Sequence, residues 1–174
     1  STRIFFEKLE EITGLRKRNH SMLCDAFKPY EEYFILPKAT ANSDVNWFAF
    51  AVTIKDNSPF NRTELVNFLE NNKIQTRPYF AGCILLQPAY SGLYNGDVRS
   101  RFPNAVKATT NTFFLGVSPV ISVEQIEYIK NTLSEFIKKK RAAGSGSALL
   151  NEQFNKKRCE VTKSTSNQIK CDQL

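Results

Sequence analysis

Histidine is nearly absent from this chain, and its few cysteines are scattered. The 174 residues include 1 His and 4 Cys, namely Cys24, Cys83, Cys159 and Cys171, with no CxxC pair. Structural zinc sites need four Cys or His ligands at characteristic spacings, so the sequence predicts no metal site. Cys159 and Cys171 could close a small loop in an oxidising environment, but free thiols are favoured for a protein expected in the cytoplasm.

Long apolar runs are also missing. No stretch approaches the roughly 20 apolar residues that span a bilayer. The opening segment "STRIFFEKLEE" lacks the basic region and long apolar stretch of a secretory signal. We therefore expect a cytoplasmic location and no membrane partner. The apolar content of 41%, with 12% aromatic residues, is enough for the core of about one domain.

Acidic residues are outnumbered by basic ones, which gives a net charge of +7. Much of the excess lies in three short clusters, at residues 16–18, 138–141 and 155–158. A surface that binds nucleic acid interleaves its basic residues with aromatic side chains that stack on bases. These clusters have no such aromatics, so we interpret them as solvated charge and predict no nucleic-acid partner.

The composition changes near residue 142, and this change sets the predicted domain organisation. Residues 1–141 have the composition of a folded domain, whereas residues 142–147, "AAGSGS", form a Gly/Ser run typical of a flexible linker. Residues 148–174 are polar and show no sustained apolar period. This tail is expected to be disordered, to fold on a partner, or to derive from a fusion.

Apolar spacing and capping signals predict three helices and three strands within residues 1–141. Residues 3–28 carry apolar positions at helical spacing, with a break expected near Gly14. Asn61 with Glu64, and Ser122 with Gln125, form capping boxes that open two more helices. The predicted strands are 46–54, 73–77 and 112–117. This order predicts an α+β fold, a small antiparallel or mixed sheet with helices packed on it.

Between the last two predicted strands, residues 78–110 show no convincing period. A loop of this length in a compact domain is usually functional or disordered, and its aromatic content argues against disorder. Arg77 precedes the loop, where its guanidinium could clamp a phosphate or carboxylate. An ion pair with Glu70 or Asp97 explains Arg77 equally well.

Further residues of this loop are candidates for ligand contact. Tyr79, Phe80 and Tyr90 could stack on a ring or base, but from the residues alone plain core packing is favoured for them. Gln87 could fix hydroxyl groups. Gly82 permits a tight turn or a close backbone approach to a ligand. The loop therefore has the residue types of a wall around something flat, polar and anionic.

Several segments together resemble the C-terminal small domain of the pyridoxal-phosphate-dependent nucleotide-sugar aminotransferase and dehydratase family. The resemblance covers about residues 8 to 140, and order, spacing and loop length all match. The segments are "RKRN" at 16–19, "ILP" at 35–37, "NWFAFAVTIKDNSPFNRTELVNFLENNKIQTRPYFAGCILLQPAY" at 46–90, "FPNA" at 102–105 and "TTNTFFLGVSPVISVEQIEYI" at 109–129.

Within that family, "RPYFAGCILLQP" at 77–88 resembles the "TRxLFAGNLxxQP" pattern of nucleotide-4-keto-6-deoxyhexose 3-dehydrases. Many aminotransferases carry an "HYxPLH"-like segment there instead. Cys83 stands where the pattern usually has asparagine. The resemblance implies a small domain like that of a fold-type I enzyme, closest to the CDP-4-keto-6-deoxyglucose 3-dehydrase type. Such enzymes remove the C3 hydroxyl of a sugar nucleotide, on the route to the dideoxyhexoses of surface polysaccharides such as the O-antigen of lipopolysaccharide.

By this resemblance, the chemistry needs groups that lie in the family's large N-terminal domain. That domain holds the pyridoxal or pyridoxamine phosphate, the aspartate at the pyridine nitrogen, and the catalytic lysine or histidine. One type also holds an iron–sulfur cluster there, so Cys24 and Cys83 are not carried over as ligands. His20 does not match the catalytic histidine and is expected on a helix surface or interface. No catalytic residue and no cofactor are thus expected in this chain alone.

The resemblance implies substrate-binding roles for Arg77, Phe80, Gly82, Gln87 and Tyr90, in a cleft between small and large domains. The favoured hypothesis is a detached small domain of a 3-dehydrase, inactive alone. Its implied partners are a nucleotide sugar, the missing large domain and, as a candidate, a reductase. Two alternatives stay open: a fragment of an amino-transferring relative, or a non-catalytic scaffold that presents residues 148–174 to a partner.

Overall fold

The computed structural model describes residues 8–143. The chain divides into two compact units, residues 1–136 and 137–174, and the sheet described below lies in the first. A helix also covers residues 123–143. The other elements are α2 (Leu9–Phe27), η1 (Lys28–Tyr30), β1 (Phe34–Ile35), β2 (Ala49–Ile54), α3 (Arg62–Asn71), β3 (Thr76–Pro78), η2 (Ile84–Leu86), η3 (Pro88–Tyr90), α4 (Val98–Arg101), α5 (Pro103–Asn111) and β4 (Thr112–Gly116).

The strands form one antiparallel sheet in the order β1-β2-β4-β3. β2 pairs with β4, so that Phe50 lies opposite Leu115. β3 pairs with the other side of β4, and Arg77 lies opposite Phe114. The predicted α+β class is confirmed. The short β1, which pairs with the outer edge of β2, was not predicted because two residues give no readable period.

One face of this sheet forms the core. Every second residue of β2 is buried, as expected for a strand with one covered face, and Phe50 and Val52 are fully buried. Phe27 of α2 packs against Phe50 with ring centroids 5.2 Å apart. Phe136 packs against Phe60 at 5.0 Å. Each such side chain contributes about 1.5–3 kcal/mol by burial, which holds the helices on this face.

The predicted helix starts are confirmed by their caps. The Asn61 side chain accepts a hydrogen bond from the Glu64 amide at 3.0 Å. The Ser122 amide donates to the Gln125 side chain at 2.9 Å, and the Gln125 amide donates back to the Ser122 hydroxyl at 3.3 Å. The break expected near Gly14 is wrong, because α2 continues through it. An interior glycine costs only about 1 kcal/mol, which the buried residues later in α2 offset.

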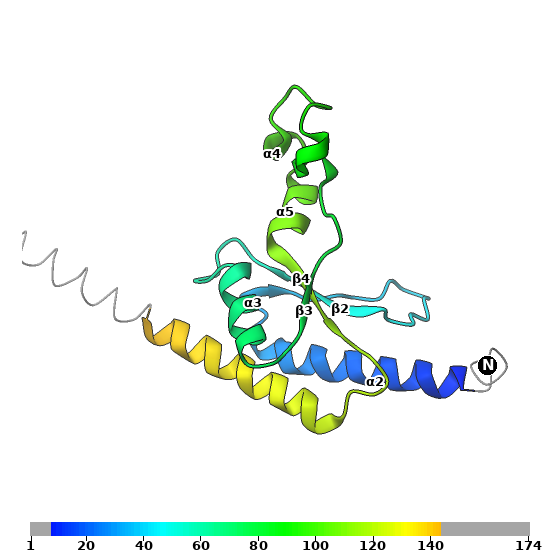
Figure 1. The fold of residues 1–174 in the computed structure, drawn as a ribbon. Helices are drawn as coiled ribbons and strands as arrows, with labels where there is room; N and C mark the ends of the chain where they lie inside the picture. Colours follow the sequence, from blue (N-terminus) through cyan, green and yellow to red (C-terminus); the bar gives the residue numbers. More distant parts are fainter. Residues whose placement is uncertain (1–7, 144–174) are drawn as a thin grey trace, which may run out of the picture. The chain divides into compact units, whose positions relative to one another are not determined.

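The segment between β3 and β4 is more ordered than predicted. The described residues there form η2, η3, α4 and α5, and Figure 1 shows this excursion projecting from the side of the sheet opposite α2. These turns and helices are too short to show an apolar period. Only Val106 of α5 is buried, so α5 also lacks the apolar stripe that predicts a helix.

His20 lies in the core, so the predicted surface position is wrong. Its imidazole is 4% exposed and stacks on Trp47 with ring centroids 3.8 Å apart and nearly parallel planes. Nδ1 lies 3.7 Å from the Cys24 Sγ, and Nε2 has no hydrogen-bond partner among the described residues. Burial in this apolar setting lowers the pKa of His20 to about 4.

This lowered pKa predicts acid sensitivity. Unfolded His20 titrates near pH 6.5 and folded His20 near pH 4, so the unfolded state binds more protons as the pH falls between these values. The stability that His20 contributes is therefore present above pH 6.5, and about 1–2 kcal/mol of it is lost by pH 5. Urea unfolding at pH 7.5 and pH 5 measures this loss.

The matched variant is His20→Phe, which keeps a stacked ring and removes the titration. Carboxylates titrate mainly below pH 5, so they affect both proteins equally in this window. The free energy of unfolding of the variant should fall less than that of the parent chain. An equal fall in both proteins would contradict this assignment.

Candidate functional site

The candidate loop begins at β3, where a carboxylate fixes the backbone. Glu70 of α3 accepts hydrogen bonds from the Thr76 amide at 2.5 Å and from the Thr76 hydroxyl at 2.8 Å. These bonds lower the pKa of Glu70, and the charge of Arg77 adds a smaller effect in the same direction. The residue before Arg77 is thus held at a defined position. Arg77 itself is exposed, and no described carboxylate lies within ion-pair distance of it.

After β3 the chain turns sharply. The Phe80 amide donates to the Pro78 carbonyl at 2.8 Å, and Phe80 has a φ of 49°. Bulky residues rarely adopt this left-handed conformation, which costs about 1–3 kcal/mol and is often found at functional sites. Gly82, with a φ of 62°, completes the turn. The two predicted residues therefore lie in one strained turn, with Phe80 exposed.

Three hydrogen bonds fasten this turn to its surroundings. The Cys83 amide donates to the Thr109 hydroxyl at 2.5 Å, and that hydroxyl donates to the Ala105 carbonyl at 2.9 Å. The Gln87 side-chain amide donates to the Ala81 carbonyl at 2.8 Å. Gln87, predicted to contact substrate hydroxyls, here supports the turn with one of its donors. Nothing in the sequence pointed to a role for Thr109, which lies in the segment 78–110 that shows no convincing period.

Phe80 belongs to a cluster of three rings from separate parts of the chain. Phe48 lies 6.3 Å from Phe80, Phe114 lies 6.0 Å from Phe48, and Phe80 lies 5.9 Å from Phe114, between ring centroids. Phe48 and Phe114 were not among the residues predicted from the sequence. For Phe114 the signal was present, because the alternation that buries Phe113 turns its neighbour to the opposite face. Phe48 had no such signal, since it precedes β2 and alternation alone would place it on the same face as Phe50.

Of the five predicted residues, three line two different hollows. Arg77 lines a hollow of about 220 Å³ against α3. Phe80 and Gly82 line another of about 350 Å³ against Ala105 and Ala108 of α5. Gln87 and Tyr90 line neither, and Tyr90 is exposed on η3. A single substrate pocket formed by all five stays a prediction.

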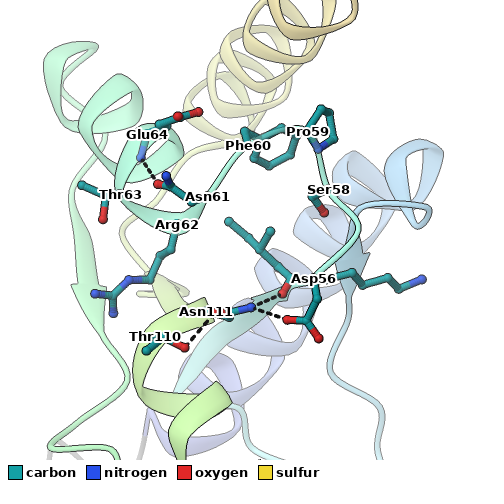
Figure 2. Close-up of a pocket in the computed structure, with 12 residues that line it drawn as sticks. Asp56, Ser58, Pro59, Phe60, Asn61, Arg62, Thr63, Glu64, Thr110 and Asn111 are labelled. Carbon is teal, nitrogen blue, oxygen red and sulfur yellow. Dashed lines mark hydrogen bonds between the residues drawn. The ribbon is translucent and has the colours of Figure 1, made fainter. Parts of the chain in front are cut away.

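A separate hollow of about 460 Å³ lies at the start of α3 and contains none of the predicted residues (Figure 2). Several of its polar groups are engaged in hydrogen bonds within the chain. Asn111 donates to the Ile54 carbonyl at 3.0 Å and to Asp56 at 2.9 Å, and Arg62 donates to the Thr109 carbonyl at 3.0 Å. The hydrogen bond from Lys107 is the main reason that the pKa of Asp56 is lowered. We therefore interpret this hollow as a structural junction between α3, β2 and α5.

The residues of the candidate loop fit an anionic or sugar group, but they do not fit pyridoxal phosphate. The chemistry of that cofactor takes a lysine or histidine at its reactive carbon and a charged group at the pyridine nitrogen. Residues 77–90 include no Asp, Glu, Lys or His, and Arg77 is their one charged side chain. His20 is stacked in the core. The groups that bind the cofactor would therefore have to lie outside this loop.

The described residues also offer no metal centre. No group of three His, Cys, Asp or Glu side chains within residues 8–143 could hold a metal ion. Cys24 and Cys83 are free thiols, and burial, with a smaller effect of Asp25, raises the pKa of Cys24. Between residues 8 and 143, none of the helices has the length and apolar character that crossing a bilayer requires.

Comparisons with known proteins agree with the fold. A sequence profile of the DegT/DnrJ/EryC1/StrS aminotransferase family matches residues 3–134. Lipopolysaccharide biosynthesis protein RfbH of Salmonella typhimurium is 36% identical over 130 residues, which are 75% of this chain and 30% of RfbH. The dTDP-4-dehydro-2,6-dideoxy-D-glucose 3-dehydratase of Saccharopolyspora spinosa is 36% identical over 136 residues, or 76% of this chain and 28% of the relative.

Solved structures also match most of this chain while it covers only about a third of theirs. The Escherichia coli GDP-4-keto-6-deoxy-D-mannose-3-dehydratase with bound hydrated PLP matches 74% of this chain and 32% of its own, with 26% identity and a TM-score of 0.58. An aminotransferase from Psychrobacter cryohalolentis, at 16% identity and a TM-score of 0.69, shares the fold. The chain spans about 30% of the length of the curated relatives.

Proposed function

The chain belongs to the DegT/DnrJ/EryC1/StrS aminotransferase family, and on that premise we propose that it is the C-terminal, substrate-facing portion of a nucleotide-sugar 3-dehydratase. The observation that carries the proposal is the loop "RPYFAGCILLQP" at 77–88, together with 36% identity to a 3-dehydratase. The reaction removes the C3 hydroxyl of a 4-keto-6-deoxy sugar. The remaining two thirds of such an enzyme supply the cofactor pocket and the catalytic base, so the isolated chain is inactive.

In this proposal the loop binds and orients the sugar nucleotide. Arg77 clamps the anionic part of the substrate, because its guanidinium is exposed, has no described carboxylate partner and is placed by the Glu70–Thr76 bonds. Phe80 and Gly82 shape the pocket wall. Gln87 holds the Ala81 carbonyl and through it the turn, and Tyr90 provides a further wall.

The cofactor, when held by the rest of the enzyme, supplies the electron sink that the elimination needs. The residues of this chain contribute binding energy and the exclusion of water. The aromatic side chains around Phe80 place apolar surface beside the substrate, which strengthens the attraction between Arg77 and the phosphate by lowering the local dielectric.

The test grafts residues 8–143 onto the Saccharopolyspora spinosa dehydratase in place of its matching 136 residues, and measures dehydration of that enzyme's substrate. We expect Arg77→Ala to lower kcat/KM about 30-fold, because charged hydrogen bonds contribute about 1.5–3 kcal/mol. Arg77→Lys should recover little of it, since lysine lacks the bidentate fork.

The matched control is Arg99→Ala on the exposed α4, which should change kcat/KM less than twofold. A grafted enzyme that turns over normally with Arg77→Ala would contradict the role of Arg77. A folded, cofactor-loaded graft without any dehydration would contradict the dehydratase assignment itself.

Transamination is the second candidate function, because the family profile is that of aminotransferases and the fold matches them with TM-scores up to 0.69. The products separate the two reactions. A dehydratase product lacks the C3 oxygen, whereas a transaminase product gains nitrogen from glutamate. The scaffold alternative depends on residues 148–174, which lie outside the described residues.

A further inference from the structure

The segment between η3 and α4 contains an asparagine that is followed by glycine. Asn95–Gly96 is the one Asn-Gly pair in the sequence. It lies within residues 91–97, at the end of the excursion farthest from the sheet (Figure 1), and both residues are exposed. Because Gly96 has no Cβ, its backbone nitrogen can approach the preceding side chain without a steric clash. Asparagine is among the thermally labile residues, so this pair is a candidate for chemical modification.

We propose that Asn95 is a site of spontaneous deamidation. The Gly96 amide nitrogen loses its proton to hydroxide and attacks Cγ of Asn95, which closes a five-membered succinimide ring. The side-chain nitrogen leaves as ammonia. Water then opens the ring at one of its two carbonyl carbons. The product is aspartate, or isoaspartate when the main-chain carbonyl is attacked. Water is the one co-reactant, and no atom is oxidised or reduced.

The reacting amide is available in the fold. Among residues 8–143, none accepts a hydrogen bond from the Gly96 amide, and none is hydrogen-bonded to the Asn95 side chain. Asp97, the next residue, is held at the start of α4, where its carboxylate accepts hydrogen bonds from the Arg99 amide at 3.0 Å and from the Ser100 hydroxyl. The Gly96 nitrogen therefore has no hydrogen bond to break before it attacks.

The fold also requires the glycine that favours the reaction. A Cβ at position 96 would lie 2.8 Å from ring atoms of Tyr94, which is closer than real Cβ contacts come. The Tyr94 ring is in turn packed against Phe102, with ring centroids 5.5 Å apart. A larger residue at position 96 would have to displace this ring. The packing of the segment therefore favours the residue that makes Asn95 reactive.

Two other exposed asparagines show how the fold can suppress this reaction. Asn42 and Asn57 each precede a serine, and all four residues except Ser58 are exposed. The Ser43 and Ser58 amides donate to the carbonyls of the residues three positions earlier, at 3.3 Å and 3.1 Å. An amide held in such a bond must be released by local opening before it can attack, which slows the reaction. Asn95 lacks this protection.

The reaction changes the charge and the main chain of the segment. A carboxylate in place of the neutral amide lowers the formal net charge of residues 91–102 from +1 to zero. The aspartate product keeps the length of the main chain, whereas isoaspartate adds a methylene group to it. Because Tyr94 and Asp97 are held on either side of the pair, the longer main chain should disturb the contact between Tyr94 and Phe102.

Incubation of the full 174-residue chain at pH 8, followed by tryptic digestion and mass spectrometry, tests this proposal. Trypsin does not cut before Pro78, so the peptide of residues 74–99 is released whole, and Asn95 is its one asparagine. Its mass should rise by the difference between OH and NH2, in two products that separate by chromatography. The matched variant Asn95→Gln should remain unmodified at this position, since glutamine would have to close a less favourable six-membered ring.

Comparison of the folded chain with the chain in urea decides whether the structure leaves this site open. In the folded chain, Asn95 should convert at least about tenfold faster than Asn57, and unfolding should accelerate Asn57 at least about fivefold but Asn95 less than about twofold. Equal rates for Asn95 and Asn57 in the folded chain would overturn the proposal. Acceleration of Asn95 by urea as large as that of Asn57 would also overturn it, because the fold would then protect this site.

Discussion

Replacing Gly82 with alanine is expected to destabilise the chain by about 3 kcal/mol. Gly82 has a φ of 62°, and a Cβ there would lie 2.9 Å from the Cα of Thr109 and 2.8 Å from its Cβ. The left-handed conformation costs a non-glycine residue about 1–2 kcal/mol, and displacement of packed backbone adds about 1–3 kcal/mol. Because the Thr109 hydroxyl accepts the hydrogen bond of the Cys83 amide, the clash also disrupts this bond, which holds the turn in place.

The matched control is Gly92→Ala in the same excursion. Nothing lies within 4 Å of a Cβ at Gly92, and its φ is outside the left-handed range, so the change in the free energy of unfolding should stay within about 0.5 kcal/mol. Urea unfolding at pH 7.5 measures both. Equal midpoints for Gly82→Ala and Gly92→Ala would contradict the description of the turn.

Asn19→Ala is expected to cost about 3 kcal/mol of stability. Asn19 is fully buried, and its side-chain amide donates to the Ser118 carbonyl at 2.7 Å and to the Ile121 carbonyl at 3.3 Å. Its oxygen accepts from the Arg18 guanidinium at 2.9 Å. Alanine removes these hydrogen bonds, each of which contributes about 0.5–1.5 kcal/mol, or about 1.5–3 kcal/mol where a charged group takes part. Asn19 thereby joins segments about a hundred residues apart in the sequence.

Asn46→Ala serves as the control for this change. Asn46 is exposed, and its amide reaches the Thr13 hydroxyl at only 3.4 Å, so we expect a loss below about 0.5 kcal/mol. Thermal unfolding followed by circular dichroism compares the two variants. If Asn19→Ala also loses less than about 0.5 kcal/mol of stability, the 118–121 turn does not depend on this side chain.

The sequence predicted the elements whose signals are local and regular. The segment of β2 is rich in aromatic and β-branched residues, and the caps at Asn61 and Ser122 are chemical patterns that act within one turn. The strand, the helices and the fold class followed from these signals. The helices after β3 could not be predicted in this way, since their stability comes from tertiary contacts such as the Arg62 bond to the Thr109 carbonyl.

The candidate site was predicted by residue type but not by arrangement. Arg77, Phe80 and Gly82 were singled out, yet the ring cluster with Phe48 and Phe114 depends on strand register, which joins residues more than 30 positions apart. His20 was misplaced for a related reason. A histidine on a helix gives no sign of burial unless the partner that covers it, here Trp47, is known.

We propose above all that this chain is the substrate-facing portion of an enzyme whose cofactor is held elsewhere. Titration of pyridoxal phosphate and pyridoxamine phosphate, followed by visible absorbance and calorimetry, tests it on the 174-residue chain and on the grafted enzyme. The account predicts no stoichiometric binding by the isolated chain and one equivalent per grafted subunit. Tight stoichiometric binding by the isolated chain would contradict it.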